Sequence, residues 1–380
     1  MSHLSKVCLI CCLTILPLSQ VQAESEASHT VIKQLEINHQ DLSFERDANA
    51  IKRTYESELY TFSAFKQGHY GLRMYRQTQD QKYKGAIWSD LARVASRLNE
   101  ITTEIYTPDA IKAYSELRVN GYENSDAVRR KLRFEATVDQ PEYLFLGIDL
   151  LGSMARADEY GLQHKEDDKL RAIIQRYDFS SYASDPEMIR AWAAQLANQV
   201  YWLKQLGEQD VTQTFIDAFR KTYPDDEDSD LTDQQYMNKL YGLTHIIIAA
   251  SGYYQHEIKQ ADYQWIFDYY RNNIDTIMLR SKEDVIAEVG INLLLAGLYD
   301  DPIVVRAKQH IQASIDREYM MVPSVNGSTD LSGGEHRNVL AVMLLNWHKP
   351  QAIPTIQHQA NMFSALPFGL IKKKESLVKQ

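Results

Sequence analysis

Cysteine is almost absent from this 380-residue chain, and its three cysteines, Cys8, Cys11 and Cys12, all lie close to the N-terminus. They fall in an apolar run that follows Lys6, and small residues end the segment at Ala23. One positive charge, about a dozen apolar residues and a small terminal residue are typical of a secretory signal peptide. We expect cleavage after Ala23, a periplasmic or secreted location, and a mature chain without disulfides or cysteine-bound metal.

Long apolar runs and basic stretches are also scarce. The apolar run in residues 1–23 is too short to span a bilayer comfortably, so we expect no membrane span after cleavage. Removing 23 of the 380 residues takes away only one charged residue, Lys6, and changes the formal net charge from −10 to −11. An acidic chain is a poor candidate for nonspecific nucleic-acid binding, so we expect no nucleic-acid partner.

Turn-forming residues are few as well, with 16 glycines and 10 prolines, which argues against a β-sandwich. Helical periodicity dominates instead, as a weak repeat of paired helices. In GHYGLRMYRQTQDQKYKGAIWSDLARVASRL, a largely apolar helix runs from Gly68 to about Thr78 and a more amphipathic helix follows a short polar turn. Comparable units start at Tyr143, Ala191, Tyr241, Ala287 and Gly334.

The apolar first helices should be buried and the amphipathic second helices should lie outside them. The pattern predicts an all-α fold, an α/α toroid of about five to six helical hairpins, with an open helical solenoid as the alternative. The predicted division is a signal peptide over residues 1–23, the toroid domain over residues 24–348 and a C-terminal extension over residues 349–380.

Two resemblances accompany this pattern. The helix–turn–helix order in GHYGLRMYRQTQDQKY resembles the α/α toroids of carbohydrate-active enzymes, which implies a glycan substrate. The combination of GLTHIIIAASGYYQ, EVGINLLLAGLYDDP and GEHRN is similar to an uncharacterised family of exported bacterial proteins with no assigned function. The second resemblance is closer, but it implies no reaction.

In a toroid the first turns of the buried helices face one opening, where free N–H groups and helix dipoles favour anions. Gly333 and Gly334 are expected to let the backbone turn sharply before the helix that starts with Glu335. Tyr70 and Trp192 could stack on a sugar ring there. The residues expected to bind a ligand at this opening are His69, Tyr70, Trp192, Asn198, Asp330, Arg337 and Asn338.

The candidate catalytic residues are His245, Tyr254, Glu288, Glu335 and His336, which are polar exceptions in or beside apolar helices. Certain toroid polysaccharide lyases pair a His with a Tyr, and this resemblance implies such roles for His245 and Tyr254. Nine residues of helix would separate that pair by about 13 Å, which weakens the parallel. A hydrolase needs two carboxylates, for which Glu288 and Glu335 are the chosen pair and Asp330 the substitute.

Structural roles compete with catalysis at each position. Glu335 could simply be a negative charge near a helix N-terminus, and Glu288 a buried, hydrogen-bonded link between hairpins. His245, Glu288 and His336 could together hold a metal, but the sequence has no HExxH motif, so we expect neither metal nor cofactor. It has no G-x-S-x-G motif and no Gly-rich phosphate loop either.

The sequence therefore predicts acid/base processing of an anionic glycan by lyase or hydrolase chemistry. Glu335 or His245 would act as base, Tyr254 or Glu288 as acid, and the Arg337 and Asn338 side chains would hold a substrate carboxylate. The alternative is a non-catalytic glycan- or peptide-binding protein of the envelope.

Overall fold

A computed structural model describes residues 40–123, 125, 127–351 and 363–373. The chain divides into two compact units, Met1–Arg46 and Asp47–Gln380. In the first unit the described residues, 40–46, are helical. The signal peptide predicted for residues 1–23 lies outside the described residues. All further description concerns the second unit.

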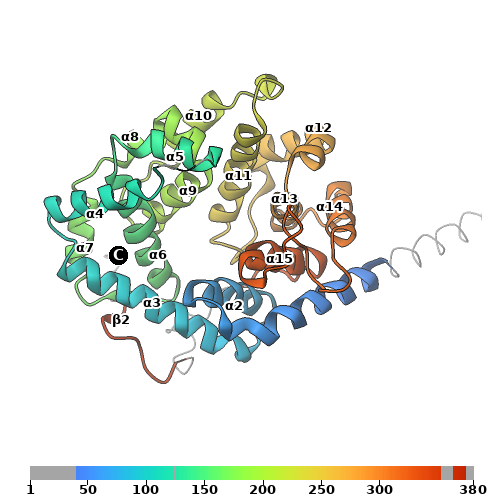
Figure 1. Ribbon diagram of the computed structural model, residues 1–380, viewed down its shortest axis with the longest axis horizontal. Coiled ribbons are helices and arrows are strands. Elements are labelled where there is room, and N and C mark those ends of the chain that lie inside the picture. Colours follow the sequence, from blue (N-terminus) through green and yellow to red (C-terminus); the bar gives the residue numbers. More distant parts are fainter. Residues whose placement is uncertain (1–39, 124, 126, 352–362, 374–380) are drawn as a thin grey trace, which may run out of the picture. The chain divides into compact units, whose positions relative to one another are not determined.

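The described part of the chain is almost entirely helical, which confirms the predicted all-α class. The second unit opens with helical residues 47–58. The elements that follow (Figure 1) are η1 (Leu59–Thr61), α2 (Ala64–Thr78), η2 (Gln81–Tyr83), α3 (Lys84–Thr103), α4 (Pro108–Asn120), α5 (Val128–Thr137), the π-helical η3 (Leu144–Leu150), α6 (Leu151–Glu159), β1 (Leu162–His164), α7 (Asp167–Ile174), α8 (Phe179–Ser184), α9 (Pro186–Gln205), α10 (Thr212–Thr222), η4 (Asp225–Glu227), α11 (Asp233–Ala250), η5 (Gln260–Tyr263), α12 (Gln264–Arg280), α13 (Glu283–Leu295), α14 (Pro302–Ala313), α15 (Leu331–Leu345) and β2 (Leu370–Lys372).

The helices predicted to be buried pack side by side, although they come from distant parts of the sequence. Helix α2 contacts α15, α15 contacts α13, α13 contacts α11, and α11 contacts α9 (Figure 1). Helix α9 also contacts α6, which packs on α3. Helices α3, α10 and α14 are the partners expected of amphipathic second helices, packing on α2, α9 and α13 respectively. Whether this order of neighbours belongs to a toroid or a solenoid stays a prediction.

The buried helices begin earlier than the apolar pattern predicted. Their first turns lie ahead of the continuous apolar runs and are capped by side chains: Asp185 caps α9, Thr232 forms a capping box with Gln235 at α11, and Asp330 caps α15. The predicted starts at Ala191, Tyr241 and Gly334 were therefore wrong by several residues. As a result, His245 lies in the C-terminal half of α11 rather than at its start.

Two glycines permit close packing around α15. Gly334 lies inside the first turns of α15, where an added Cβ would come 2.8 Å from Tyr55 Oη and 2.9 Å from Met321 Cε. The expected Gly-Gly hinge before Glu335 is therefore wrong, because the helix already starts at Leu331. A Cβ on Gly290 of α13 would come 2.7 Å from Leu344 Cδ1. Gly290 thus allows the close approach of α13 and α15, the helices that carry Glu288 and Glu335.

Strands β1 and β2 form a short antiparallel pair, the only sheet among the described residues. Gln163 pairs with Ile371 in its register. Part of the segment predicted as a C-terminal extension therefore lies against the loop after α6. Within the described ranges, no helix is both long and apolar enough to cross a membrane.

Candidate functional site

Four neighbouring helices bring titratable side chains together in the otherwise apolar interior. Each helix contributes two residues, which are either adjacent in the sequence or four positions apart on one helix face. The contributions are His69 and Arg73 from α2, Thr244 and His245 from α11, Asp284 and Glu288 from α13, and Glu335 and His336 from α15. We call His69, Arg73, His245, Glu288, Glu335 and His336 the His–Glu cluster.

His69 and Glu335 form the shortest contact of the cluster. Nδ1 of His69 lies 2.7 Å from Oε1 of Glu335, and the His69 ring lies 5.3 Å from the ring of His336, centroid to centroid. Burial raises the pKa of Glu335 to about 7, against the lowering effect of Arg73 and His336. Burial and the Arg73 charge hold the pKa of His69 well below its ordinary value. His69 is therefore neutral near pH 7, where Glu335 changes its protonation state.

Glu288 faces two imidazoles. Its Oε2 accepts a hydrogen bond of 2.7 Å from Thr244 Oγ1, while its Oε1 lies 3.6 Å from Nε2 of His336 and 3.8 Å from Nε2 of His245. Burial, together with the nearby Asp284 charge, raises its pKa to about 8, against the lowering effects of the Thr244 hydrogen bond and Arg73. A carboxyl group in this environment is mostly protonated at pH 7 and can donate a proton.

The two imidazoles beside Glu288 are neutral but accessible. Burial lowers the pKa of His245 to about 3 and that of His336 to about 4. Nδ1 of His245 lies 2.9 Å from Oδ1 of Asn198, so this nitrogen carries the proton and Nε2 is left as an acceptor on the side of Glu288. Solvent still reaches 18% of the His245 side chain and 40% of the His336 side chain. The cluster is therefore not sealed inside the protein.

Arg73 supplies a positive charge at the centre of the cluster. Its Nη1 donates to the carbonyl oxygen of His69 at 3.2 Å, and its buried Nε has no hydrogen-bond partner. None of the described carboxylates forms an ion pair with it within 4.0 Å. Its charge nevertheless lowers the pKa of both Glu288 and Glu335. A buried guanidinium with a free donor is a suitable partner for an anionic ligand group.

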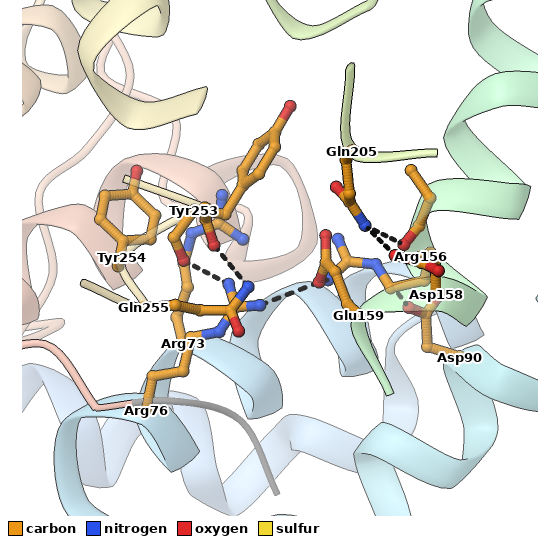
Figure 2. A network of polar contacts seen from close by, with 12 residues as sticks. Arg73, Arg76, Asp90, Arg156, Asp158, Glu159, Gln205, Tyr253, Tyr254 and Gln255 are labelled. Carbon is orange, nitrogen blue, oxygen red and sulfur yellow. Dashed lines mark hydrogen bonds and ion pairs between the residues drawn. The ribbon is translucent and has the colours of Figure 1, made fainter. Parts of the chain in front are cut away.

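The turn after α11 brings Tyr254 to Arg73. Gly252, Tyr253 and Tyr254 have φ angles of 61°, 55° and 71°, a left-handed conformation that is rare for bulky side chains. Arg76 holds the turn by donating to the Tyr253 carbonyl oxygen (Figure 2). The Arg73 guanidinium carbon consequently lies 5.4 Å from the centroid of the Tyr254 ring. The straight-helix separation expected from the sequence therefore does not describe Tyr254, because the chain reverses before it.

A family model covers this whole arrangement. It is described as Domain of unknown function (DUF3541) and matches residues 44–373. The chain belongs to the DUF3541 family. The resemblance to an uncharacterised family is thereby confirmed, while export remains a prediction. No curated protein and no solved structure gives a match to the chain.

The DUF3541 chain brings together the candidate residues His69, Asn198, His245, Glu288, Glu335 and His336, with Tyr254 beside Arg73. Both aromatic candidates for sugar stacking lie elsewhere. Tyr70 is fully buried and stacks on Tyr55 at 6.0 Å. Trp192 is buried at a kink in α9, where the Arg133 guanidinium covers its ring at 4.0 Å. Neither ring face is open to a ligand.

Three polar candidates in or next to α15 hold the fold instead of facing the cluster. Asp330 caps the helix. Asn338 accepts from the Val322 N–H at 2.7 Å and donates to the Val322 carbonyl at 2.9 Å. Arg337 donates to the same carbonyl at 3.3 Å. Arg337 and Asn338 therefore bond to the loop before α15, while Glu335 contacts His69 of α2 and His336 lies near Glu288 of α13.

The metal alternative gains no geometric support. Among the described residues, no group of three or more His, Cys, Asp or Glu side chains is arranged to hold a metal ion. The contacts of Glu288 with His245 and His336, at 3.8 and 3.6 Å, are longer than a shared metal would require.

Sequence reasoning missed Arg73, Asp284 and the cationic neighbour Lys66, whose ammonium group donates to Ser332. One signal for Arg73 was present, because it follows His69 by four residues in an apolar helix and must share its face. Asp284 carried the same signal, because it precedes Glu288 by four residues in α13. Its contact with the Tyr241 hydroxyl at 2.7 Å, in contrast, crosses between helices and could not be predicted from spacing.

Proposed function

We propose that this DUF3541 protein carries out acid/base processing of an anionic glycan, by lyase or hydrolase chemistry. The observation that carries the proposal is the presence of two buried carboxyl groups in one cluster, Glu288 and Glu335, whose pKa values lie at about 8 and about 7. General acids and bases work best when their pKa values lie near the working pH. Perturbed carboxyl groups of this kind are enriched at catalytic sites.

Each carboxyl group has a distinct role in the proposal. Glu335, oriented by the 2.7 Å contact with His69, is the base, because its pKa is the lower of the two. Glu288 is the acid. Thr244 donates a hydrogen bond to it, and the partly exposed His245 and His336 side chains lie between it and the solvent from which a substrate would approach. Both neutral imidazoles have a donor and an acceptor nitrogen and can pass protons or bind sugar hydroxyls. Tyr254 is a second candidate acid.

The charge of the surroundings supports an anionic substrate. Arg73, Lys66 and Arg129 all exert a positive potential on cluster residues. Arg73 is the residue proposed to hold a substrate carboxylate or sulfate, in place of Arg337 and Asn338, because its Nε lacks a partner.

The toroid and the export of the protein belong to the same proposal. The contact between α2 and α15, together with the 2.9 Å ion pair of Arg76 in α2 with Glu159 in α6, supports a closed arrangement of the buried helices. The composition of residues 1–23 supports export to the periplasm or beyond.

The test is turnover of uronate and sulfated polysaccharides by the purified protein. New absorbance from an unsaturated sugar identifies a lyase, and new reducing ends without that absorbance identify a hydrolase. Glu335→Gln and Glu288→Gln should each lower the rate about 10²–10⁴-fold. Glu318→Gln, at an exposed position remote in sequence from the cluster residues of α15, is the matched control and should retain full activity.

The non-catalytic alternative makes a different prediction. A binding protein would be stabilised against heat by the polysaccharide without any turnover, and Arg73→Gln would abolish that stabilisation. Absence of both turnover and stabilisation across uronate and sulfated glycans would reject the proposed substrate class.

A further inference from the structure

A cavity lies at the C-terminal ends of α6, α9 and α11. Its volume is about 550 Å³, within the range of small-molecule sites, and no member of the His–Glu cluster lines it. Four aromatic side chains and two amides form much of its wall: Tyr201, Trp202, Tyr253, Tyr263, Gln205 and Gln255. Neither the proposed reaction nor the candidate residues predicted from the sequence account for it.

The charged groups of this wall are already paired within the protein. Glu159 bonds to Arg76 at 2.9 Å and to Arg156 at 3.0 Å (Figure 2). Lys204 pairs with Asp210 at 3.0 Å. Asp158 accepts from Gln205 at 3.0 Å and pairs with Lys373 of the C-terminal segment. A ligand in the cavity would therefore meet little uncompensated charge, in contrast to the surroundings of Arg73.

What remains for a ligand is flat aromatic surface next to hydrogen-bonding groups. The rings of Trp202 and Tyr253 lie 6.1 Å apart with planes inclined by only 17°. The hydroxyl groups of Tyr201 and Tyr263 lie 3.0 Å apart and form a polar edge. Both Gln205 and Gln255 use their amide nitrogens in protein hydrogen bonds, which leaves the carbonyl oxygens as acceptors.

We propose that this cavity is a second ligand site, which binds a neutral saccharide of one or two rings. Sugar rings present apolar C–H faces that pack on aromatic rings, and hydroxyl groups that bond to amide oxygens, tyrosine hydroxyls and carboxylates. The paired charges of the wall select against a uronate or a sulfated sugar. The inference is independent of the proposed reaction, because it requires no chemistry at Glu288 or Glu335.

The site borders the His–Glu cluster through a single turn. Tyr253 lines the cavity, while the next residue, Tyr254, lies against Arg73, and the two side chains point to different sides of the turn (Figure 2). Arg76 stabilises this turn by donating a hydrogen bond to the Tyr253 carbonyl oxygen. Variants of the two sites can therefore be made separately, and their effects compared.

The experiment is isothermal titration calorimetry of the chain predicted after signal-peptide cleavage, residues 24–380, with maltose, cellobiose and N,N′-diacetylchitobiose as probes. At least one probe should bind, and Trp202→Ala should weaken it about tenfold or more, as expected for loss of an aromatic stacking partner. Trp202→Phe should retain part of the affinity while losing any ligand-dependent change in tryptophan emission. Circular dichroism melting confirms that each variant is folded.

Two controls separate this proposal from the one at the cluster. Trp88→Ala removes an exposed tryptophan outside the cavity and should leave probe affinity unchanged, as should Glu318→Gln at an exposed position outside both sites. If the neutral probes bind while uronate and sulfated polysaccharides are not turned over, the result would support this site and reject the proposed reaction. Failure of all three probes to bind, or equal binding by Trp202→Ala and the unmodified protein, would overturn the neutral-saccharide site whatever the result at the cluster.

Discussion

Nδ1 of His69 lies 2.7 Å from Oε1 of Glu335, although α2 is near the beginning and α15 near the end of the amino-acid sequence of the DUF3541 domain. The contact forms because α2 and α15 pack directly together. It places a neutral imidazole against a carboxyl group whose pKa has been raised to about 7. The orientation of the proposed base therefore depends on tertiary contact between the two ends of the domain.

The rate of the proposed reaction should depend on pH with a bell-shaped profile. Glu335 must be ionised to accept a proton, so kcat/KM should rise with pH through about 7. Glu288 must be protonated to donate one, so kcat/KM should fall above about 8. The measurement is kcat/KM from pH 5 to pH 10 with a polysaccharide that is turned over. A profile that is flat across this range would contradict the assigned roles.

Arg73→Gln should raise KM for an anionic glycan about 10–100-fold, because a charge-assisted contact with the substrate is lost. Both limbs of the pH profile should also move to higher pH, since Arg73 lowers the pKa of Glu288 and of Glu335. Arg73→Lys keeps the charge and should keep the limbs in place. Arg118→Gln, which alters a partly exposed arginine paired with Asp149 at 3.6 Å, is the control and should change neither property.

Glu288→Gln should gain stability relative to the unmodified protein as pH rises. The folded-state pKa of Glu288 is about 8 and its ordinary value is 4.5, so between these values the folded state holds a proton that the unfolded state has released. Stability from this group is complete below about pH 4.5 and is lost as pH rises to 8. Urea unfolding gives the free energy of unfolding of each protein at pH 5 and at pH 8. Between these two pH values the unmodified protein should lose on the order of a few kcal/mol more of this free energy than Glu288→Gln does. Parallel dependences would contradict burial of Glu288.

His245→Gln should make the protein less sensitive to acid. The folded-state pKa of His245 is about 3 against an ordinary 6.5, so below 6.5 the unfolded state binds a proton that the folded state refuses. Stability is therefore lost as pH falls from 6.5 toward 3, and removing the imidazole removes that dependence. Thermal melting at pH 4.5 and pH 7 measures it. His310→Gln, in the last turn of α14, is the control and should retain the acid sensitivity of the unmodified protein.

Asn338→Ala should destabilise the fold by about 1–3 kcal/mol without changing KM of the folded protein, because its buried amide bonds to both backbone groups of Val322. Chemical denaturation and kinetics on the same sample separate the two effects. A rise in KM comparable to that of Arg73→Gln would instead return Asn338 to the ligand-binding role first predicted from the sequence.

Much of the secondary structure follows from local sequence. Apolar residues at a spacing of 3.6, with few glycines and prolines, predicted the all-α class correctly because this pattern is a property of neighbouring residues. The helix starts were less predictable, because the first turns capped by Asp185, Thr232 and Asp330 lie ahead of the continuous apolar runs. The same caps explain why Asp330 could be mistaken for a ligand-binding group.

The sequence by itself determined which chemically able side chains interrupt the apolar helices, including His69, His245, Glu288 and Glu335. Only the tertiary structure decided that these four meet, that Arg73 lies among them, and that Asn338 does not. The physical reason is that the direction of a side chain around its helix acquires meaning only when neighbouring helices are in place. Likewise, the burial that moves the pKa values of Glu288 and Glu335 toward neutrality comes from residues scattered along the chain.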